Sequence, residues 1–144
     1  MKLILTRFDP RHIVNVVFAL PNLSLSDEIM SQIRDFHNRD QSEYISHISN
    51  PSVFIEEGPF IAKFFTLPSN WGDDYQDEFM LLTLHFDEHE NTTFIQDSLR
   101  NTIENLKQIA GLSKAFYIST PHADAVAFKA YGAMIRILTE GFFE

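Results

Sequence analysis

The sequence contains no cysteine, which excludes disulfide bonds and thiolate metal sites. It is also poor in basic residues, because 11 Lys and Arg stand against 20 Asp and Glu and the formal net charge is -9. Nucleic acids and anionic lipid surfaces both attract proteins through Lys and Arg side chains. The charge balance therefore argues against either of them as a partner.

Long apolar runs are absent as well: no window of 18 residues is apolar, so no membrane-spanning helix is expected. The first ten residues reach Arg7 and Asp9 before any long apolar run, unlike a secretory signal peptide. We therefore expect a cytoplasmic protein. The sequence also lacks the Gly-x-Ser-x-Gly elbow of hydrolases and the glycine-rich phosphate loop, so we expect neither enzyme activity nor a bound cofactor.

The 144 residues are enough for one domain, residues 1–144, with a core rich in rings because 14 of them are Phe. The clearest element is residues 79–86, which are apolar except for Thr83 and His85, as is typical of a buried strand. In residues 94–110 apolar positions recur at steps of three and four, which predicts an amphipathic helix with Thr93 and Gln96 as a capping box. The expected centre of the core is Leu82, Leu84, Leu99, Ile103 and Leu106.

Turn and capping residues divide the rest of the chain. A hairpin of two strands is predicted at residues 2–8 and 12–20. A third strand is predicted at 52–56, after an irregular stretch that begins at Tyr44 and contains Pro51. A fourth strand is predicted at 59–67, after a turn at Glu57 and Gly58. The further helices are predicted from an N-cap at Ser24 to about Asn38, and from Thr120 and Pro121 to about Glu140, with Gly141 after it. Gly111 is expected to end the helix of residues 94–110 in a left-handed conformation.

The order of these elements is β-β-α-β-β-β-α-α. Five strands joined mainly as antiparallel neighbours, with helices packed on them, predict an α+β fold built on a five-stranded antiparallel sheet. Apolar residues of the last helix cover roughly 200° of its circumference, about twice an ordinary core-facing stripe, so we expect it to face two apolar surfaces.

Residues 62–88, AKFFTLPSNWGDDYQDEFMLLTLHFDE, combine an aromatic strand, a Pro-Ser-x-Trp turn, an acidic linker and a strand ending in acidic residues. Together with the element order, this segment resembles the longin domains, which are profilin-like modules of vesicle trafficking, and in particular small archaeal longin-like proteins. The irregular stretch with Pro51 departs from the simple strand of that family. The resemblance implies a non-catalytic protein-interaction module that binds a small GTPase, a SNARE-type segment, or another longin or roadblock-type domain, including a second copy of itself.

The strand order of such a fold places the segment from Val53 to Ile55 at one edge of the sheet, with the first helix beside it. An edge strand presents unpaired amides and carbonyls that a second chain can extend. We therefore expect a partner-binding surface, for a dimer or a small GTPase, that comprises Val53, Ile55, Met30 and Arg34. Trp71 has two interpretations, because it either anchors a partner from its acidic loop or packs back over the sheet edge, and we favour the second.

Other groups of polar residues have an ordinary structural explanation that we favour. His85, Asp87, His89 and Glu90 are the one cluster with metal-capable side chains, but a solvated turn after a strand explains them, and no tightly bound metal is expected. Asp73, Asp74, Asp77 and Glu78 lack the spacing of a calcium loop, so we expect them to form a solvated acidic loop. Ser119, His122 and Asp124 have the residue types of a hydrolase triad but lie in a predicted helix start.

The alternative function is a sensor domain of profilin-like shape that holds a small ligand on its sheet. A sensor requires a pocket between the sheet and the long helix, lined by a few converging polar groups. An interaction module requires instead a continuous apolar patch on an edge strand or a helix.

Overall fold

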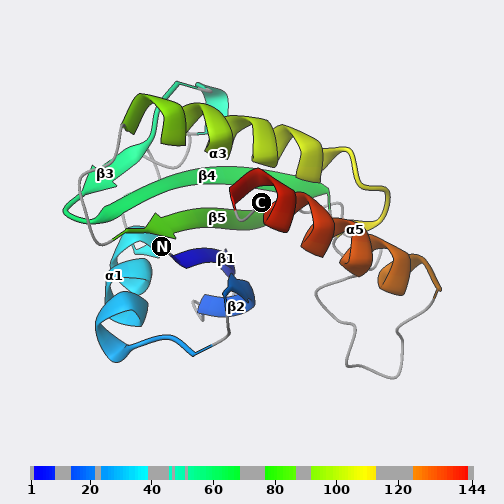
Figure 1. Cartoon of the computed structure of the whole chain (residues 1–144), viewed down its shortest axis with the longest axis horizontal. Coiled ribbons are helices and arrows are strands. Elements are labelled where there is room, and N and C mark those ends of the chain that lie inside the picture. Colours follow the sequence, from blue (N-terminus) through cyan, green and yellow to red (C-terminus); the bar gives the residue numbers. More distant parts are fainter. Residues whose placement is uncertain are drawn as a thin grey trace.

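A computed structural model describes residues 2–8, 14–21, 24–38, 46, 48–50, 52–68, 77–86, 92–112 and 125–142 (Figure 1). The elements in chain order are β1 (Lys2–Phe8), β2 (Val14–Leu20), α1 (Asp27–His37), β3 (Ile55–Glu57), β4 (Phe60–Pro68), β5 (Asp77–His85), α3 (Thr92–Lys107) and α5 (Ala125–Phe142). This order confirms the predicted α+β arrangement. None of the helices that the structure describes is long and apolar enough to span a membrane.

The five strands form one antiparallel sheet in the order β2-β1-β5-β4-β3. β5 lies at its centre, as the sequence predicts, and Leu82 of β5 is opposite Leu5 of β1 on one side and Lys63 of β4 on the other. The assignment of Asp77 and Glu78 to an acidic loop is wrong, since both lie in β5, opposite Pro68 and Leu67 of β4. Ladder hydrogen bonds join backbone groups, so a polar side chain does not end a strand.

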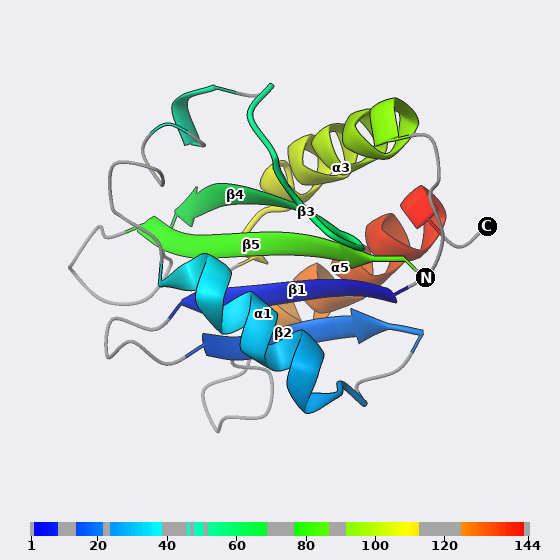
Figure 2. The same cartoon turned by 90° about the vertical axis from the view of Figure 1, so that its left-hand side faces the viewer.

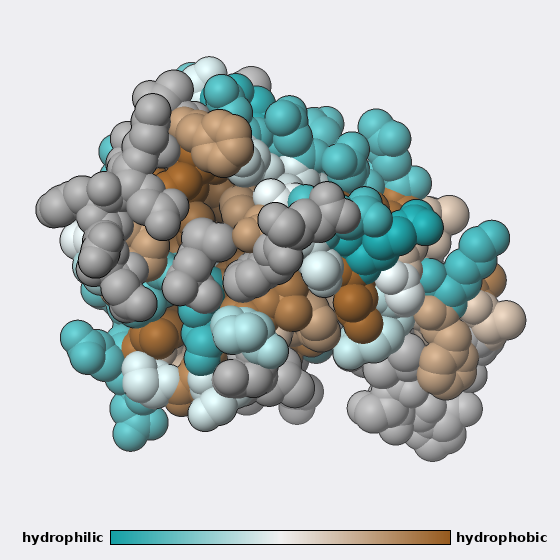
Figure 3. All heavy atoms as spheres, in the orientation of Figure 1, coloured by the Kyte–Doolittle hydropathy of each residue, from teal (hydrophilic) through white to brown (hydrophobic). Residues whose placement is uncertain are grey.

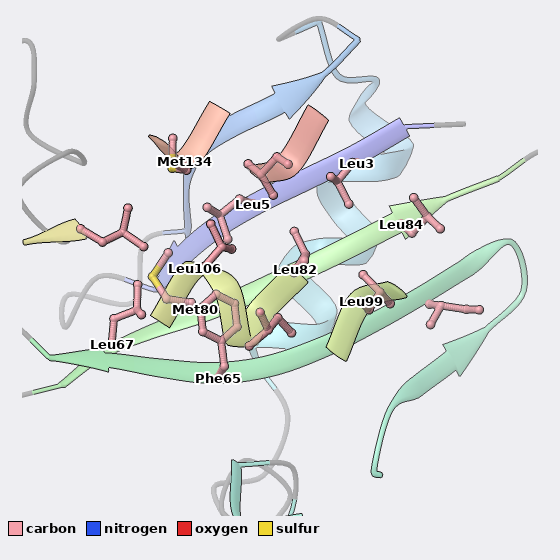
Figure 4. Close-up of a cluster of buried hydrophobic side chains, with 14 of the residues drawn as sticks. Leu3, Leu5, Phe65, Leu67, Met80, Leu82, Leu84, Leu99, Leu106 and Met134 are labelled. Atoms are coloured by element: carbon pink, nitrogen blue, oxygen red, sulfur yellow. The ribbon is translucent and has the colours of Figure 1, made fainter. Parts of the chain in front are cut away.

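Helices cover both faces of the sheet. Figure 2 looks onto the face that α1 covers, and α3 and α5 lie behind the sheet in that view. Side chains alternate between the two faces of a strand, and the strands are apolar on both, so two separate core clusters form. The cluster beneath α3 and α5 contains Leu3, Leu5, Ile61, Phe65, Leu67, Met80, Leu82, Leu84, Phe86, Ile95, Leu99, Ile103, Leu106, Leu112, Ala130, Met134 and Leu138, of which Figure 4 labels ten.

This cluster includes all five residues expected at the centre of the core, so that prediction is confirmed. The cluster beneath α1 contains Ile4, Ala19, Ile33, Phe36, Ile55, Phe60, Ala62, Phe64 and Leu81. With a core on each side of the sheet, the strands are held by packing as well as by their ladders.

The long helix α3 has the predicted amphipathic character, but its start differs. Ile95 is buried at 4% exposure and Phe94 is 72% exposed, so Ile95 occupies the core position. Hydrophilic side chains follow the outer side of α3 (Figure 3). The capping box is wrong, because α3 already includes Thr92 and the Gln96 side chain donates a hydrogen bond to the Glu56 carboxylate of β3. Beyond α3, Gly111 has φ +68°, which confirms the expected left-handed conformation.

The last helix also differs at its end. Gly141 was expected to follow it, but α5 continues through Gly141 to Phe142, and its predicted start at Thr120 and Pro121 lies outside the described residues. A Cβ at Gly141 would stand 2.7 Å from the Thr102 hydroxyl oxygen of α3, a separation that real Cβ atoms essentially never show. Glycine is therefore needed at this position for the close approach of α5 to α3.

Replacing Gly141 with alanine is expected to lower the free energy of unfolding by about 1–3 kcal/mol, the usual cost of overpacking. Thr102 is buried at 4% exposure and β-branched, so few χ1 rotamers are open to its side chain. Gly132 of the same helix is the matched control, because its added Cβ would meet nothing within 4 Å. Gly132→Ala should stabilise by about 0.5–1 kcal/mol, as alanine does in a helix.

Urea denaturation of the single variants and of Gly141→Ala with Thr102→Ala tests the contact. Removing the Thr102 hydroxyl should recover most of the loss that Gly141→Ala causes. Losses that simply add in the double variant would show that the two residues do not interact.

Candidate functional site

The described sheet ends at β3, a strand of three residues. β3 pairs only with β4, with Glu57 opposite Phe60 across a turn of two residues, and no described strand lies on its outer side. Gly58 opens this turn with φ +55°, the conformation that glycine supplies at the first position of a type II′ hairpin turn.

The register of the hairpin decides which backbone groups of β3 are directed outward. The pair that closes a two-residue turn is hydrogen-bonded, and hydrogen-bonded and non-hydrogen-bonded pairs alternate along an antiparallel ladder. Glu56, opposite Ile61, is next to the closing pair. Its backbone N–H and C=O are therefore directed away from β4, to the outer edge of the described sheet, where an added strand could bind them.

Beside this edge lies a pocket of about 300 Å³ between α1 and the β3–β4 turn. We call it the α1–β3 pocket. It is lined by Ser26, Glu28, Ile29, Gln32, Glu57, Gly58, Pro59, Phe60 and His85. Figure 2 shows why residues from three separate segments meet here: the N-terminal end of α1, the β3–β4 turn and the end of β5 all lie toward one end of the sheet.

The first turn of α1 is fixed by its cap. Ser26 is the N-cap, and its hydroxyl accepts a hydrogen bond from the Ile29 amide at 3.2 Å, a role that serine commonly fills. The prediction placed the cap two residues earlier, at Ser24. Asp27 and Glu28 lie in the first turn, where their negative charges interact favourably with the positive end of the helix dipole. The cap therefore fixes where Glu28 lies at the rim of the pocket.

Aromatic rings form the apolar part of the pocket. Phe60 is buried, with its ring 5.9 Å from Phe36 of α1 in an edge-to-face arrangement. The half-buried His85 ring lies 4.8 Å from Phe60, tilted by 49°. Edge-to-face packing at such distances is favourable for aromatic pairs, so these contacts hold α1, β4 and β5 together at this end of the sheet.

A buried lysine positions the chain that leads into β3. Lys63 of β4 is only 5% exposed, and its ammonium donates to the carbonyls of Asn50 at 2.8 Å and Val53 at 2.7 Å. Burial, followed by the nearby charges of Lys107 and Arg100, lowers the pKa of Lys63 to about 8. Lys63 therefore fastens the residues before β3 to the sheet, and a single cation inside the apolar run FIAKFFTLP is the sequence signal that could have revealed it.

The structure separates the residues predicted to form one partner surface. Strand β3 is at the edge of the described sheet, as expected. It begins only at Ile55, because the Lys63 ammonium binds the Val53 carbonyl and Val53 therefore lies before the ladder. Ile55 is 4% exposed and its side chain packs in the core beneath α1, so the burial does not favour its predicted part in partner binding, which stays a prediction. Trp71 lies outside the described residues.

Met30 and Arg34 are not brought to the β3 edge. At about 100° per residue, positions two away from Gln32 lie roughly 160° around the helix. Gln32 lines the α1–β3 pocket, so Met30 and Arg34 are on the opposite flank of α1. Glu28 and Gln32 are the helix residues that sequence reasoning missed, because a helical wheel does not show which flank faces which strand.

The other candidate sites are only partly described. Of the predicted metal-capable cluster, His85 lines the α1–β3 pocket, and Asp87, His89 and Glu90 lie outside the described residues. Asp73 and Asp74 of the acidic loop also lie outside them. So do all three residues of the triad-like group, Ser119, His122 and Asp124. Within the described ranges, no three His, Asp or Glu side chains are grouped closely enough to hold a metal ion.

The pocket that a sensor would need lies between the sheet and α3. The described cavity at this place is lined by Lys63 and Phe65 of β4 and by Arg100 and Ile103 of α3, among others, and has a volume of about 40 Å³. Ligand pockets usually measure about 300–1,000 Å³, so this cavity has room for little more than a water molecule. Comparison with protein-family models and with curated proteins finds no match for this chain.

Proposed function

We propose that this chain is a non-catalytic protein-interaction module, which binds its partner at the β3 edge and the adjoining α1–β3 pocket. The observation that carries the proposal is the end of the sheet at β3, where the backbone of Glu56 is directed outward beside a pocket on the protein surface. A peptide or a sheet edge added there would gain main-chain hydrogen bonds from β3 and a side-chain site from the pocket.

The described cavities give less support to the alternative function, a sensor domain that holds a small ligand. A sensor would hold its ligand between sheet and α3, where the described cavity of about 40 Å³ is too small for a metabolite. The α1–β3 pocket lies instead at an end of the sheet, between α1 and the β3–β4 hairpin. Its position suits the recognition of a protein surface more than the enclosure of a small ligand.

The class of partner comes from the resemblance to longin domains. It is a small GTPase, a second longin or roadblock-type domain, or a second copy of this chain, in a trafficking role within the cytoplasm. The net charge of -9 favours a partner with a basic surface, because charge complementarity speeds encounter and disfavours wrong partners.

A matched pair of variants on α1 tests the proposal. Gln32 and Met30 are both partly exposed, on opposite flanks of one helix. Gln32→Lys is expected to weaken partner binding by at least about tenfold, or 1.4 kcal/mol, because it places a cation inside the binding surface. Met30→Lys should leave binding unchanged. Self-association is measured by sedimentation velocity, and heterologous binding by capture of the same protein from the source cell with each variant.

Circular dichroism must show that both variants keep the helix content of the parent. Equal binding by the parent and both variants would refute the surface. Loss of binding in Met30→Lys alone would instead assign the partner to the flank of α1 that carries Met30 and Arg34.

A further inference from the structure

One flank of α5 is apolar and partly exposed. Phe128, Tyr131, Gly132 and Ile135 lie within about 100° of one another on a helix that turns about 100° per residue. Phe128 is 58% exposed, Gly132 is exposed, and Tyr131 and Ile135 are half-buried. We call these four residues the α5 flank. The sequence predicts that α5 faces two apolar surfaces, and the α5 flank lies outside the stripe that faces the core.

The contacts of α5 show which way this flank is directed. The stripe that faces the core is centred about 105° round the helix from the flank and contains Ala127, Ala130, Met134 and Leu138. On the near side of that stripe, the Tyr131 ring meets Phe18 of β2 edge-to-face, with centroids 6.2 Å apart. On its far side, Gly141 approaches Thr102 of α3. The α5 flank is therefore on the side of β2 and directed away from α3.

Beside this flank, β2 ends the described sheet. The strand has seven residues, VNVVFAL, of which none is charged, and no described strand lies on its outer side. Val17, Phe18 and Leu20 are half-buried and pack against the core beneath α3 and α5. The ladder between β1 and β2 has a register shift between Leu5 and Thr6, and bulges of this kind hinder the pairing of an edge strand. Contact through side chains is therefore favoured here over a continuous added ladder.

The charges of the chain decide which occupant suits this surface. Neither β2 nor the α5 flank contains a charged residue, since Lys129, Arg136 and Glu140 share a stripe about 110° further round α5. A partner with a basic surface would find no carboxylate to bind here. Identical chains with a net charge of -9 repel one another, so they meet closely only where charges are absent. From this combination we propose that a second copy of this chain docks on the α5 flank and the adjoining β2 edge.

A single twofold axis satisfies both parts of this surface. In a dimer of identical chains with such an axis, each patch meets its own copy. An axis perpendicular to the sheet sets the two α5 flanks antiparallel and brings the two β2 edges alongside each other. When it passes between Gly132 and Ile135, Gly132 of each copy is level with Ile135 of the other. A Cβ at Gly132 would meet nothing within 4 Å, so this position has room for that Ile135 side chain.

The dimensions of the surface predict a weak dimer. A strand of seven residues is about 23 Å long and a helix of 18 residues about 27 Å long. A wall about 25 Å long and two layers, or about 20 Å, high has an area on the order of 500 Å² on each copy. This is below the standard of about 800 Å² per partner, in the range of transient complexes. We therefore expect a dissociation constant on the order of ten micromolar.

Sedimentation velocity over a concentration series tests the dimer with a matched pair of α5 variants. Phe128→Lys places a cation in the flank and should weaken dimerisation at least about tenfold, because aromatic side chains often dominate interface energies. Val126→Lys makes the same change at a residue that is 45% exposed and lies about 160° round the helix, and it should leave dimerisation unchanged. Circular dichroism must show the helix content of the parent in both variants.

Cross-linking tests the position of the twofold axis independently. The chain contains no cysteine, so Gly132→Cys introduces a single thiol close to the proposed axis. A short bismaleimide should join two copies of this variant into a covalent dimer. Gln108→Cys places a thiol on an exposed residue just beyond α3 and is the control, which should stay monomeric under the same conditions.

The proposal is overturned if the parent stays monomeric at millimolar concentration, if Phe128→Lys dimerises as the parent does, or if both thiols cross-link equally. It is independent of the proposed function, because β2 and β3 are opposite edges of the sheet. If Gln32→Lys breaks the dimer and Phe128→Lys does not, the copies meet at the β3 edge, and the proposed function stands without this inference. If Phe128→Lys breaks the dimer and Gln32→Lys affects no partner, this inference stands and the proposed function fails.

Discussion

Replacing Ile103 with alanine is expected to lower the free energy of unfolding by about 2–5 kcal/mol, the range for truncation of a buried aliphatic side chain. Ile103 is 3% exposed on the inner face of α3, in the cluster that includes Leu82 and Leu106. Truncation removes apolar area from a packed site and leaves a cavity that its neighbours fill only in part. Urea denaturation followed by circular dichroism measures the loss.

Two controls on the same segment separate burial from helix propensity. Gln108→Ala changes an exposed residue just beyond α3, and Phe94→Ala removes a large apolar side chain that is 72% exposed. Both should shift stability by less than about 0.5 kcal/mol, as surface substitutions usually do. A loss from Phe94→Ala as large as that from Ile103→Ala would mean that the outer face of α3 is also packed.

The parts of the fold that follow from the sequence are those with a regular period. Strand β5 and helix α3 each repeat their apolar positions at the interval of their own geometry, so both elements and their inner faces were predictable. The helical period did not decide whether Phe94 or Ile95 faces the core, because adjacent residues differ by only about 100° on a helix. Packing against the sheet selected Ile95.

The parts that did not follow depend on contacts between distant segments. The local pattern around Val53 is that of a strand residue, but its carbonyl accepts a hydrogen bond from the Lys63 ammonium, ten residues away in sequence. Gly141 looked like a helix terminator, but the close approach of Thr102 explains the glycine and α5 continues past it. In both cases the local pattern was compatible with the prediction, and the tertiary partner decided.

The α1–β3 pocket shows the same limit for the candidate site. Its rim residues Glu28 and Glu57 are separated by 29 positions in the sequence, and each alone is an ordinary exposed glutamate. Sequence reasoning placed an edge strand here, which the sheet order confirms. Which flank of α1 accompanies that edge depends on how the helix is rotated on the sheet, and buried residues Ile33 and Phe36 set that rotation.

A second large effect is expected in acid, from a histidine within the core beneath α1. His37 is 2% exposed, and its ring stacks on Phe8 with centroids 5.4 Å apart. Its Nε2 atom lies 2.9 Å from the Thr6 hydroxyl oxygen, which in turn lies 3.4 Å from the Leu81 carbonyl. A neutral ring with Nε2–H donating to Thr6, and Thr6 donating to Leu81, fits these distances. No described residue hydrogen-bonds Nδ1.

Burial lowers the pKa of His37 from 6.5 to about 4. A charged histidine at a helix C-terminus gains about 0.3–1 kcal/mol from the dipole, and up to about 2 when partly buried. The lowered pKa shows that desolvation outweighs this gain. As pH falls through 6.5 the unfolded chain takes up a proton that the folded protein does not accept until about pH 4. The stabilising contribution, about 3 kcal/mol, is therefore complete above pH 6.5 and is lost between pH 6.5 and 4.

The variant His37→Phe keeps an aromatic ring in this position and removes the titration. Its free energy of unfolding, measured by urea denaturation at pH 7.5 and 4.5, is compared with that of the parent, because the protonation of the many carboxylates then cancels in the difference. The parent should lose about 2–3 kcal/mol more than the variant over this range. Parallel losses in the two proteins would mean that His37 accepts its proton in the folded state near pH 6.5, and that the core beneath α1 opens enough to hydrate the ring.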